Sequence, residues 1–219
     1  MNLVELLEVP EQRQVRHGQV HGVVIGLVTN NQDPEGMGRV KVTFPWLSSD
    51  DESNWARVAA PMAGNNRGTY FLPEVGDEVL VAFDHGDVRL PYVLGALWNG
   101  QDAPPRDNSD GKNTERVIRS RAGHELVFND DSQGAHVQIT TNAGHQFILD
   151  DTSGQENITI KDKTGNNTIV IDSVQNAISI TAQMKLTLQA QTIEIDADTM
   201  LTTKAGATLT IQGTLVKIN

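Results

Sequence analysis

The chain has 219 residues, a formal net charge of −11 and no cysteine. The acidic balance argues against nucleic acid as the main partner, because lysine and arginine contacts to phosphate supply most of the affinity in such complexes. Disulfides and thiol chemistry are excluded, and no apolar run is long enough to cross a membrane.

Residues 1–17 are predicted to form an N-terminal arm. The run LVELLEV at residues 3–9 is interrupted by two glutamates, and no basic segment precedes it. A signal peptide is therefore not expected. A short amphipathic helix or docking arm is the favoured interpretation.

Residues 18–100 are predicted to form a small five-stranded barrel of the OB type. Alternation and turn residues place its strands at 18–29, 39–44, 55–59, 78–83 and 92–97, with an acidic loop at 48–53. The predicted barrel core is Val40, Val42, Phe44, Val79, Val81, Phe83 and Leu94.

The composition changes sharply after residue 105. Every proline lies at or before Pro105, and residues 101–113 form a polar, turn-rich segment that we predict to be a linker. Proline cannot donate to a β ladder, so its absence beyond this point favours a long continuous ladder in residues 114–219.

That second half repeats one apolar–polar–apolar triplet, which puts two side chains on one face of a strand and one on the other. Ala122-Gly123-His124 recurs 21 residues later as Ala143-Gly144-His145. The same step predicts that Phe128, Leu149 and Val170 are equivalent, as are Asp130, Asp151 and Asp172.

One chain cannot bury such a narrow apolar stripe on all sides. The chain either coils into a stacked solenoid or winds with other chains around a common axis. We favour the wound multimer, and a trimer because three walls make the smallest closed prism. The predicted trimer core is Val137, Ile139, Phe147, Leu149, Ile158, Ile160, Ile169, Ile171, Ile178, Ile180, Leu186, Leu188, Ile193, Ile195, Leu209 and Ile211.

Several motifs follow one another in the first half of the chain: GRVKVTFPW at 38–46, WARV at 55–58, PMAG at 61–64, FLPEVGDEVLVAF at 71–83 and PYVLG at 91–95. Together and in this order they resemble the OB domain of the VgrG and phage baseplate assembly protein V group. The resemblance is close over about residues 18–100 and generic over the tail. It implies an all-β chain in which the OB barrel is followed by an intertwined, triple-stranded β-helical needle in a homotrimer.

The resemblance also implies a function and partners. The expected role is a central spike of a contractile injection machine, without enzymatic activity or cofactor, that transiently pierces a target cell envelope. It is expected to assemble in the cytoplasm and to become part of a virion or injection particle. A separate hub protein is expected at the OB end, and the short linker leaves no place for the lysozyme domain of some phage spikes.

The same resemblance implies a small tip protein of the PAAR type at the far end. Alternation continues to the last residue without a capping sequence, so three copies of the final strand are expected to form a flat binding face. Its predicted residues are Leu215, Val216, Lys217, Ile218 and Asn219. Frayed ends in solvent are the alternative.

Four histidines and two acidic pairs are the remaining candidates for chemistry. His17 and His21 are four residues apart, a spacing that suggests a metal site on a helix. His124 and His145 occupy equivalent positions of the repeat and could bind an axial ion in a trimer. Surface or core roles are favoured for the first pair and turn roles for the second. The pairs Asp130/Asp131 and Asp150/Asp151 are explained by turn chemistry, so no catalytic or metal residue is predicted. The alternative function is a monomeric solenoid and OB module that binds a glycan or nucleic acid.

Overall fold

The computed structural model describes residues 19–218, which are almost entirely β-structure. The predicted arm at residues 1–17 lies outside the described residues. The chain divides into two compact units, one ending at Asp107 and the other beginning at Asn108. Within the described part, no helix is long and apolar enough to span a membrane.

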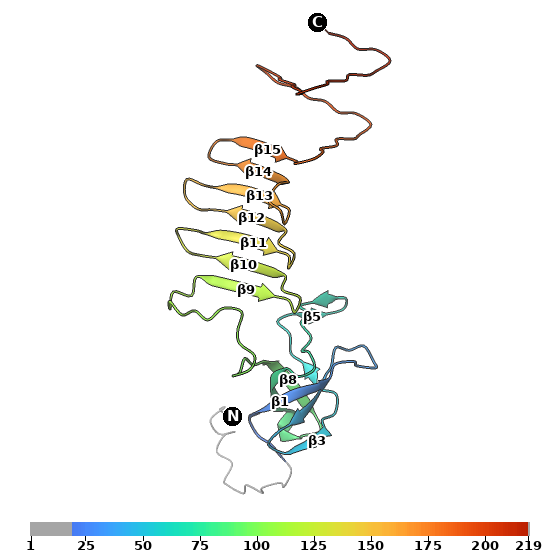
Figure 1. Ribbon diagram of the computed structural model, residues 1–219. Coiled ribbons are helices and arrows are strands. Elements are labelled where there is room, and N and C mark those ends of the chain that lie inside the picture. The colour runs from blue at the N-terminus through green and yellow to red at the C-terminus, as the bar shows by residue number, and fades with distance from the viewer. Residues whose placement is uncertain (1–18, 219) are drawn as a thin grey trace, which may run out of the picture. The chain divides into compact units, whose positions relative to one another are not determined.

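The first unit contains a six-stranded sheet with the order β3-β2-β1-β7-β8-β4 (Figure 1). Its strands are β1 Val23–Asn30, β2 Lys41–Phe44, β3 Ser48–Glu52, β4 Arg57–Val58, β7 Glu78–Phe83 and β8 Pro91–Ala96. A hairpin of β5 Ala63–Gly64 and β6 Arg67–Gly68 and a 3₁₀ turn at Asp84–Gly86 complete the unit. Paired backbone hydrogen bonds between Val40 and Ala56, 3.0 and 2.7 Å long, join β2 to the start of β4.

Alternating residues of these strands fill the barrel. The buried core is Val28, Val40, Val42, Phe44, Ala56, Val79, Val81, Phe83 and Val93. Phe44 and Phe83 stack with ring centroids 5.5 Å apart. Because a fully buried valine or phenylalanine contributes about 1.5–3 kcal/mol, this cluster gives the first unit a core of its own.

Two expectations for the barrel were wrong. Leu94 is exposed and Val93 is buried in its place, because the β7–β8 register shifts between Leu80 and Val81. The acidic segment predicted as a loop forms β3, which pairs with β2. Acidic residues are depleted in strands, so the composition of this segment predicted a loop where the structure has an edge strand.

Asp33 organises the loop between β1 and β2. Its carboxylate accepts hydrogen bonds from the backbone N–H groups of Glu35, Met37 and Arg39 at 3.0–3.3 Å. The Arg39 guanidinium donates two more, at 2.9 and 2.7 Å, and holds the pKa of Asp33 well below its usual range. Asp-Pro-Glu-Gly predicts a turn, but the contact to Arg39 was not predicted.

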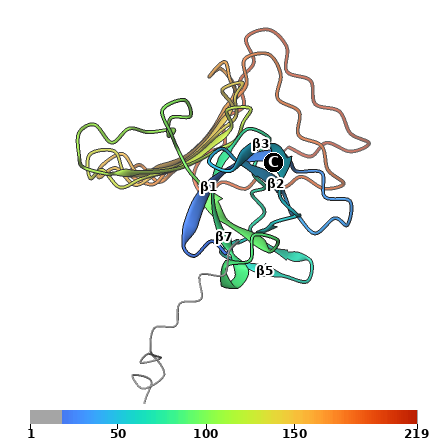
Figure 2. The same ribbon diagram turned by 90° about the horizontal axis from the view of Figure 1, so that it is seen from below.

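The second unit begins with a seven-stranded antiparallel meander in which each strand pairs with the next along the chain (Figure 1). Its strands are β9 Glu115–Arg119, β10 Glu125–Asn129, β11 His136–Thr140, β12 Gln146–Asp150, β13 Asn157–Lys161, β14 Thr168–Asp172 and β15 Ala177–Thr181. Figure 2 shows that the stacked strands form a curled sheet. The backbone hydrogen bonds of residues 115–181 are therefore made between neighbouring strands of one chain, and this segment is a meander and not a coiled solenoid.

The predicted 21-residue equivalence fails at its third member. The register pairs Val170 with Thr159, so Val170 lies on the face opposite Phe128 and Leu149. The turn at 162–167 has six residues whereas the turn at 141–145 has five, and one added residue reverses the phase of the following strand.

The remaining described residues, 182–218, contain no strand (Figure 1). We call them the distal segment. Their apolar side chains lack partners in the ladder of this chain, so the expected winding with other chains remains a prediction for this segment.

Candidate functional site

The candidate site is one face of the meander, which we call the apolar face. Residues opposite each other in the register share a face, and the pairs Phe147–Ile160, Ile160–Ile169 and Ile169–Ile180 run in a row across four strands. The apolar face consists of Ile118, Leu126, Phe128, Val137, Ile139, Phe147, Leu149, Ile158, Ile160, Ile169, Ile171, Ile178 and Ile180.

The apolar face is largely open to solvent in the single chain. Ile139 is 49% exposed, and exposure reaches 71% at Ile178 on the last strand. Exposed apolar patches of this extent mark interaction surfaces in soluble proteins. The opposite, mixed face carries polar residues at the strand ends and a central column that includes Val127, which is only 7% exposed.

The distal segment starts against one side of the apolar face. An open hollow of about 640 Å³ lies between Phe147, Ile160 and Ile169 of that face and the residues that leave β15, Lys185 and Leu186. The hollow is lined mainly by apolar atoms, so it has the character of an unfilled packing site rather than of a polar ligand site.

The predicted tip residues are exposed where the structure describes them. Leu215 is 73% and Ile218 is 89% exposed, and Val216 is also open. Asn219 lies outside the described residues. The predicted distal core residues Leu186, Leu188, Ile193, Ile195, Leu209 and Ile211 are likewise exposed in the single chain.

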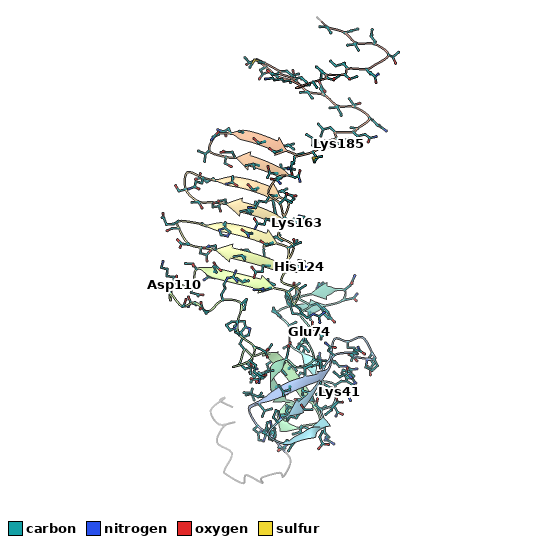
Figure 3. The ribbon with its side chains drawn as sticks, in the orientation of Figure 1. Lys41, Glu74, Asp110, His124, Lys163 and Lys185 are labelled. Carbon is teal, nitrogen blue, oxygen red and sulfur yellow. The ribbon has the colours of Figure 1, made fainter. Side chains whose placement is uncertain are left out.

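Figure 3 shows His124 and Lys163 along the same edge of the meander, where side chains hydrogen-bond to the backbone of the next turn on that edge. His124 Nδ1 accepts a hydrogen bond from the backbone N–H of Asn142 at 3.2 Å, and His145 Nδ1 accepts one from Lys163 at 3.3 Å. Asn167 Oδ1 accepts one from Gln183 at 3.1 Å. We call these three contacts the turn ladder. They were not predicted, because they join residues 16–18 apart that only the stacking of turns brings together.

Each acceptor of the turn ladder is held in place by its own turn. The N–H of His124 donates to Ser120 Oγ at 3.0 Å, and the N–H of His145 donates to Thr141 Oγ1 at 3.1 Å. In the third turn, hydrogen bonds from the Thr164 hydroxyl, with smaller help from the Asn167 amide, lower the pKa of Asp162 to about 2.

The acidic pairs take part in turns. Asp131 accepts from the N–H of Gln133 at 3.0 Å, and Asp130 forms an ion pair with Arg116 at 2.7 Å. Asp150 accepts from Thr152 at 2.8 Å, and hydrogen bonding to Thr152 lowers the pKa of Asp150.

The histidine pair at 17 and 21 is not tested as a metal site, since His17 lies outside the described residues. His21 packs over Gly86, where an added Cβ would lie 2.9 Å from its ring. In the part of the chain that the structure describes, no group of three or more metal-binding side chains converges. The arrangement is suited to protein–protein assembly.

Comparison with known proteins gives a family for the first unit. Residues 24–98 match the family described as the type VI secretion system/phage-baseplate injector OB domain. This range contains the barrel strands β1 to β8 almost entire.

Relatives match a longer part of the chain. A type VI secretion system spike protein VgrG3 of Vibrio cholerae is 35% identical over 127 residues, and VgrG1a of Pseudomonas aeruginosa is 35% identical over 132 residues. A V. cholerae protein named actin cross-linking toxin VgrG1 is 32% identical over 120 residues. These matches cover 52%, 55% and 51% of the chain, but only 12%, 20% and 11% of the relatives.

Proposed function

We propose that this chain, whose residues 24–98 match the injector OB domain and which is 35% identical to a VgrG3 spike protein over 127 residues, is the central spike of a contractile injection machine. The spike is a homotrimer whose work is mechanical. It assembles in the cytoplasm, is built into an injection particle and pierces a target envelope when the machine contracts.

The observation that carries this proposal is the exposed apolar face. A row of isoleucines such as Ile160, Ile169 and Ile180, 41–53% exposed, is not covered by any layer of the described residues 19–218. Three copies that turn these faces toward a common axis would bury them and form a closed prism. Burial at about 25 cal/mol per Å² of apolar surface supplies the driving force for that assembly.

The distal segment extends the same proposal. Its apolar pairs, such as Leu186/Leu188 and Ile193/Ile195, continue the alternation of the meander but are unpaired in one chain. Backbone N–H and C=O groups need hydrogen-bonding partners when they are buried. Winding of three distal segments about one axis would give each backbone its partners from the other two chains and extend the needle.

The proposal includes two protein partners. The OB end joins a separate hub protein, and three copies of Leu215–Asn219 bind a small PAAR-type tip protein. Exposure of Leu215 and Ile218 supports the second contact, because their side chains would be buried beneath the tip.

Measurement of mass in solution tests the trimer. Light scattering on the purified full chain should give about 72 kDa, three times the 23.9 kDa of one chain. A stable, soluble species of 23.9 kDa at micromolar concentration would overturn the proposal and favour the monomeric binding module. Co-purification with hub and tip proteins then tests the partners separately.

A further inference from the structure

The turn ladder contains two histidines whose hydrogen-bonding roles are fixed by their partners. A backbone N–H can only donate, so the Nδ1 atoms of His124 and His145 must accept. A neutral imidazole accepts at one nitrogen and donates at the other, so both rings carry their proton on Nε2. Protonation places a second N–H on Nδ1, where it would face the N–H of Asn142 or Lys163.

The third rung provides an internal reference. Asn167 occupies the equivalent place in its turn, but it accepts through an amide oxygen, 3.1 Å from the N–H of Gln183. An amide does not change charge in the pH range of proteins. The repeat therefore makes the same contact twice with a group that titrates and once with a group that does not.

His136, at the opposite edge of the sheet, has the reverse role. Its Nδ1 lies 2.6 Å from the carbonyl oxygen of Gly134, which can only accept. His136 therefore donates from Nδ1, and protonation leaves that hydrogen bond in place. Acid is expected to leave this edge intact.

Several charged groups lie near the two acceptor histidines. Arg121 and Glu125 flank His124 in its own turn and strand, and Arg119 pairs with Glu125 at 3.3 Å. Lys161, Asp162 and Lys185 line the same hollow as His145, and Lys163 donates its backbone N–H to that ring. Asp162 remains ionised at neutral pH because its pKa is about 2. Of the side-chain types at this edge, imidazole is the one that ordinarily gains a proton in mild acid.

We propose that His124 and His145 are acid-sensitive latches that hold successive turns of the meander together. At pH 7.5 both rungs are closed. In acid each ring gains a proton on Nδ1 and can no longer accept there, so the two rungs open while the Asn167 rung stays closed. Acid thus loosens the turn edge of β9 to β14 without unfolding the sheet, whose ladder hydrogen bonds are independent of these rings.

Hydrogen–deuterium exchange on the full chain at pH 7.5 and 5.5 tests the latches. After correction for intrinsic rates, protection of the Asn142 and Lys163 amides should fall at least about fivefold relative to Gln183, the change that corresponds to one ordinary hydrogen bond. The double variant His124→Asn/His145→Asn, built on the residue of the third rung, should keep its protection at both pH values. The control His136→Asn should retain the wild-type response.

Two results would overturn the proposal. One is wild-type protection at Asn142 and Lys163 that does not change with pH, and the other is an unchanged acid response in the double variant. Nitrogen NMR of the histidine side chains at pH 7.5 gives a readout that needs no variant. His124 and His145 should be Nε2–H tautomers, and an Nδ1–H tautomer in either ring would refute its role as an acceptor.

Discussion

Replacement of Ile178 by aspartate tests whether the apolar face is the trimer interface. Ile178 is 71% exposed in the single chain, so Ile178→Asp removes little packing within one copy. In the proposed trimer the exposed part of the side chain is buried, which contributes about 1.5 kcal/mol per chain. Three copies together lose about 4.5 kcal/mol of apolar burial.

The carboxylates add a larger penalty. Three aspartates near a common axis would be buried without partners, at several kcal/mol per ion. The sum exceeds about 8 kcal/mol, the free energy of binding at micromolar affinity. We therefore expect Ile178→Asp to be monomeric or aggregated at micromolar concentration in sedimentation velocity.

Ser179→Asp is the matched control. Ser179 is adjacent, exposed and on the opposite face, where it pairs with Val170. A charge on an open surface changes stability by about 0.5 kcal/mol or less, so this variant should remain trimeric. The reasoning is refuted if Ile178→Asp is a trimer with an unchanged melting temperature, or if both variants dissociate alike.

Four further outcomes are expected. A fragment of residues 1–100 should give a folded barrel by circular dichroism, whereas residues 114–219 should be trimeric or unfolded but not a folded monomer. Asp33→Asn should lower the melting temperature of the barrel, because the amide cannot reproduce the charged contact to Arg39. Because the pKa values of Asp33 and Asp162 are depressed in the folded chain, they contribute stability above about pH 4 that should be lost progressively as acid titration approaches pH 2. Deletion of residues 215–219 should abolish co-purification with the tip protein but leave the trimer intact.

Each of these outcomes has a contrary result. A folded monomer of residues 114–219 would show that the second unit has a sufficient core. Asp51→Asn serves as the control for Asp33→Asn, since Asp51 is exposed on β3. Equal changes in the melting temperature of the two variants would contradict a stabilising role of the Asp33–Arg39 contact. A midpoint of unfolding that is constant from pH 4 to about 2 would contradict the carboxylate argument. Retention of the tip protein by the shortened trimer would place its platform elsewhere.

Local alternation predicted much of the fold from the sequence. Val40, Val42 and Phe44 point into the barrel as expected, as do Val79 and Val81. In these strands a period of two is enough to decide which side chains meet. The OB family, inferred from motifs in the same strands, is confirmed by the match over residues 24–98.

The errors arose where one residue changes the phase. The register shift after Leu80 exchanges Leu94 for Val93 in the core, and the longer turn before β14 moves Val170 to the other face. Neither the register shift nor the longer turn can be predicted from apolar–polar alternation, because the strands before and after each of them alternate regularly. The intertwined needle stays a prediction, because the strands β9 to β15 are described as pairing along a single chain.

The local pairing of the meander has a consequence for the order of folding. Each strand from β9 to β15 contacts its immediate neighbour along the chain, so loop closure is short and these contacts can form soon after synthesis. The described distal segment contains no strand, and its contacts with the meander lie at its start. In the proposed trimer its folding must await the encounter of three chains, and zippering then proceeds from β15 outward. The rate of the last step should therefore depend on protein concentration, while formation of the meander should not.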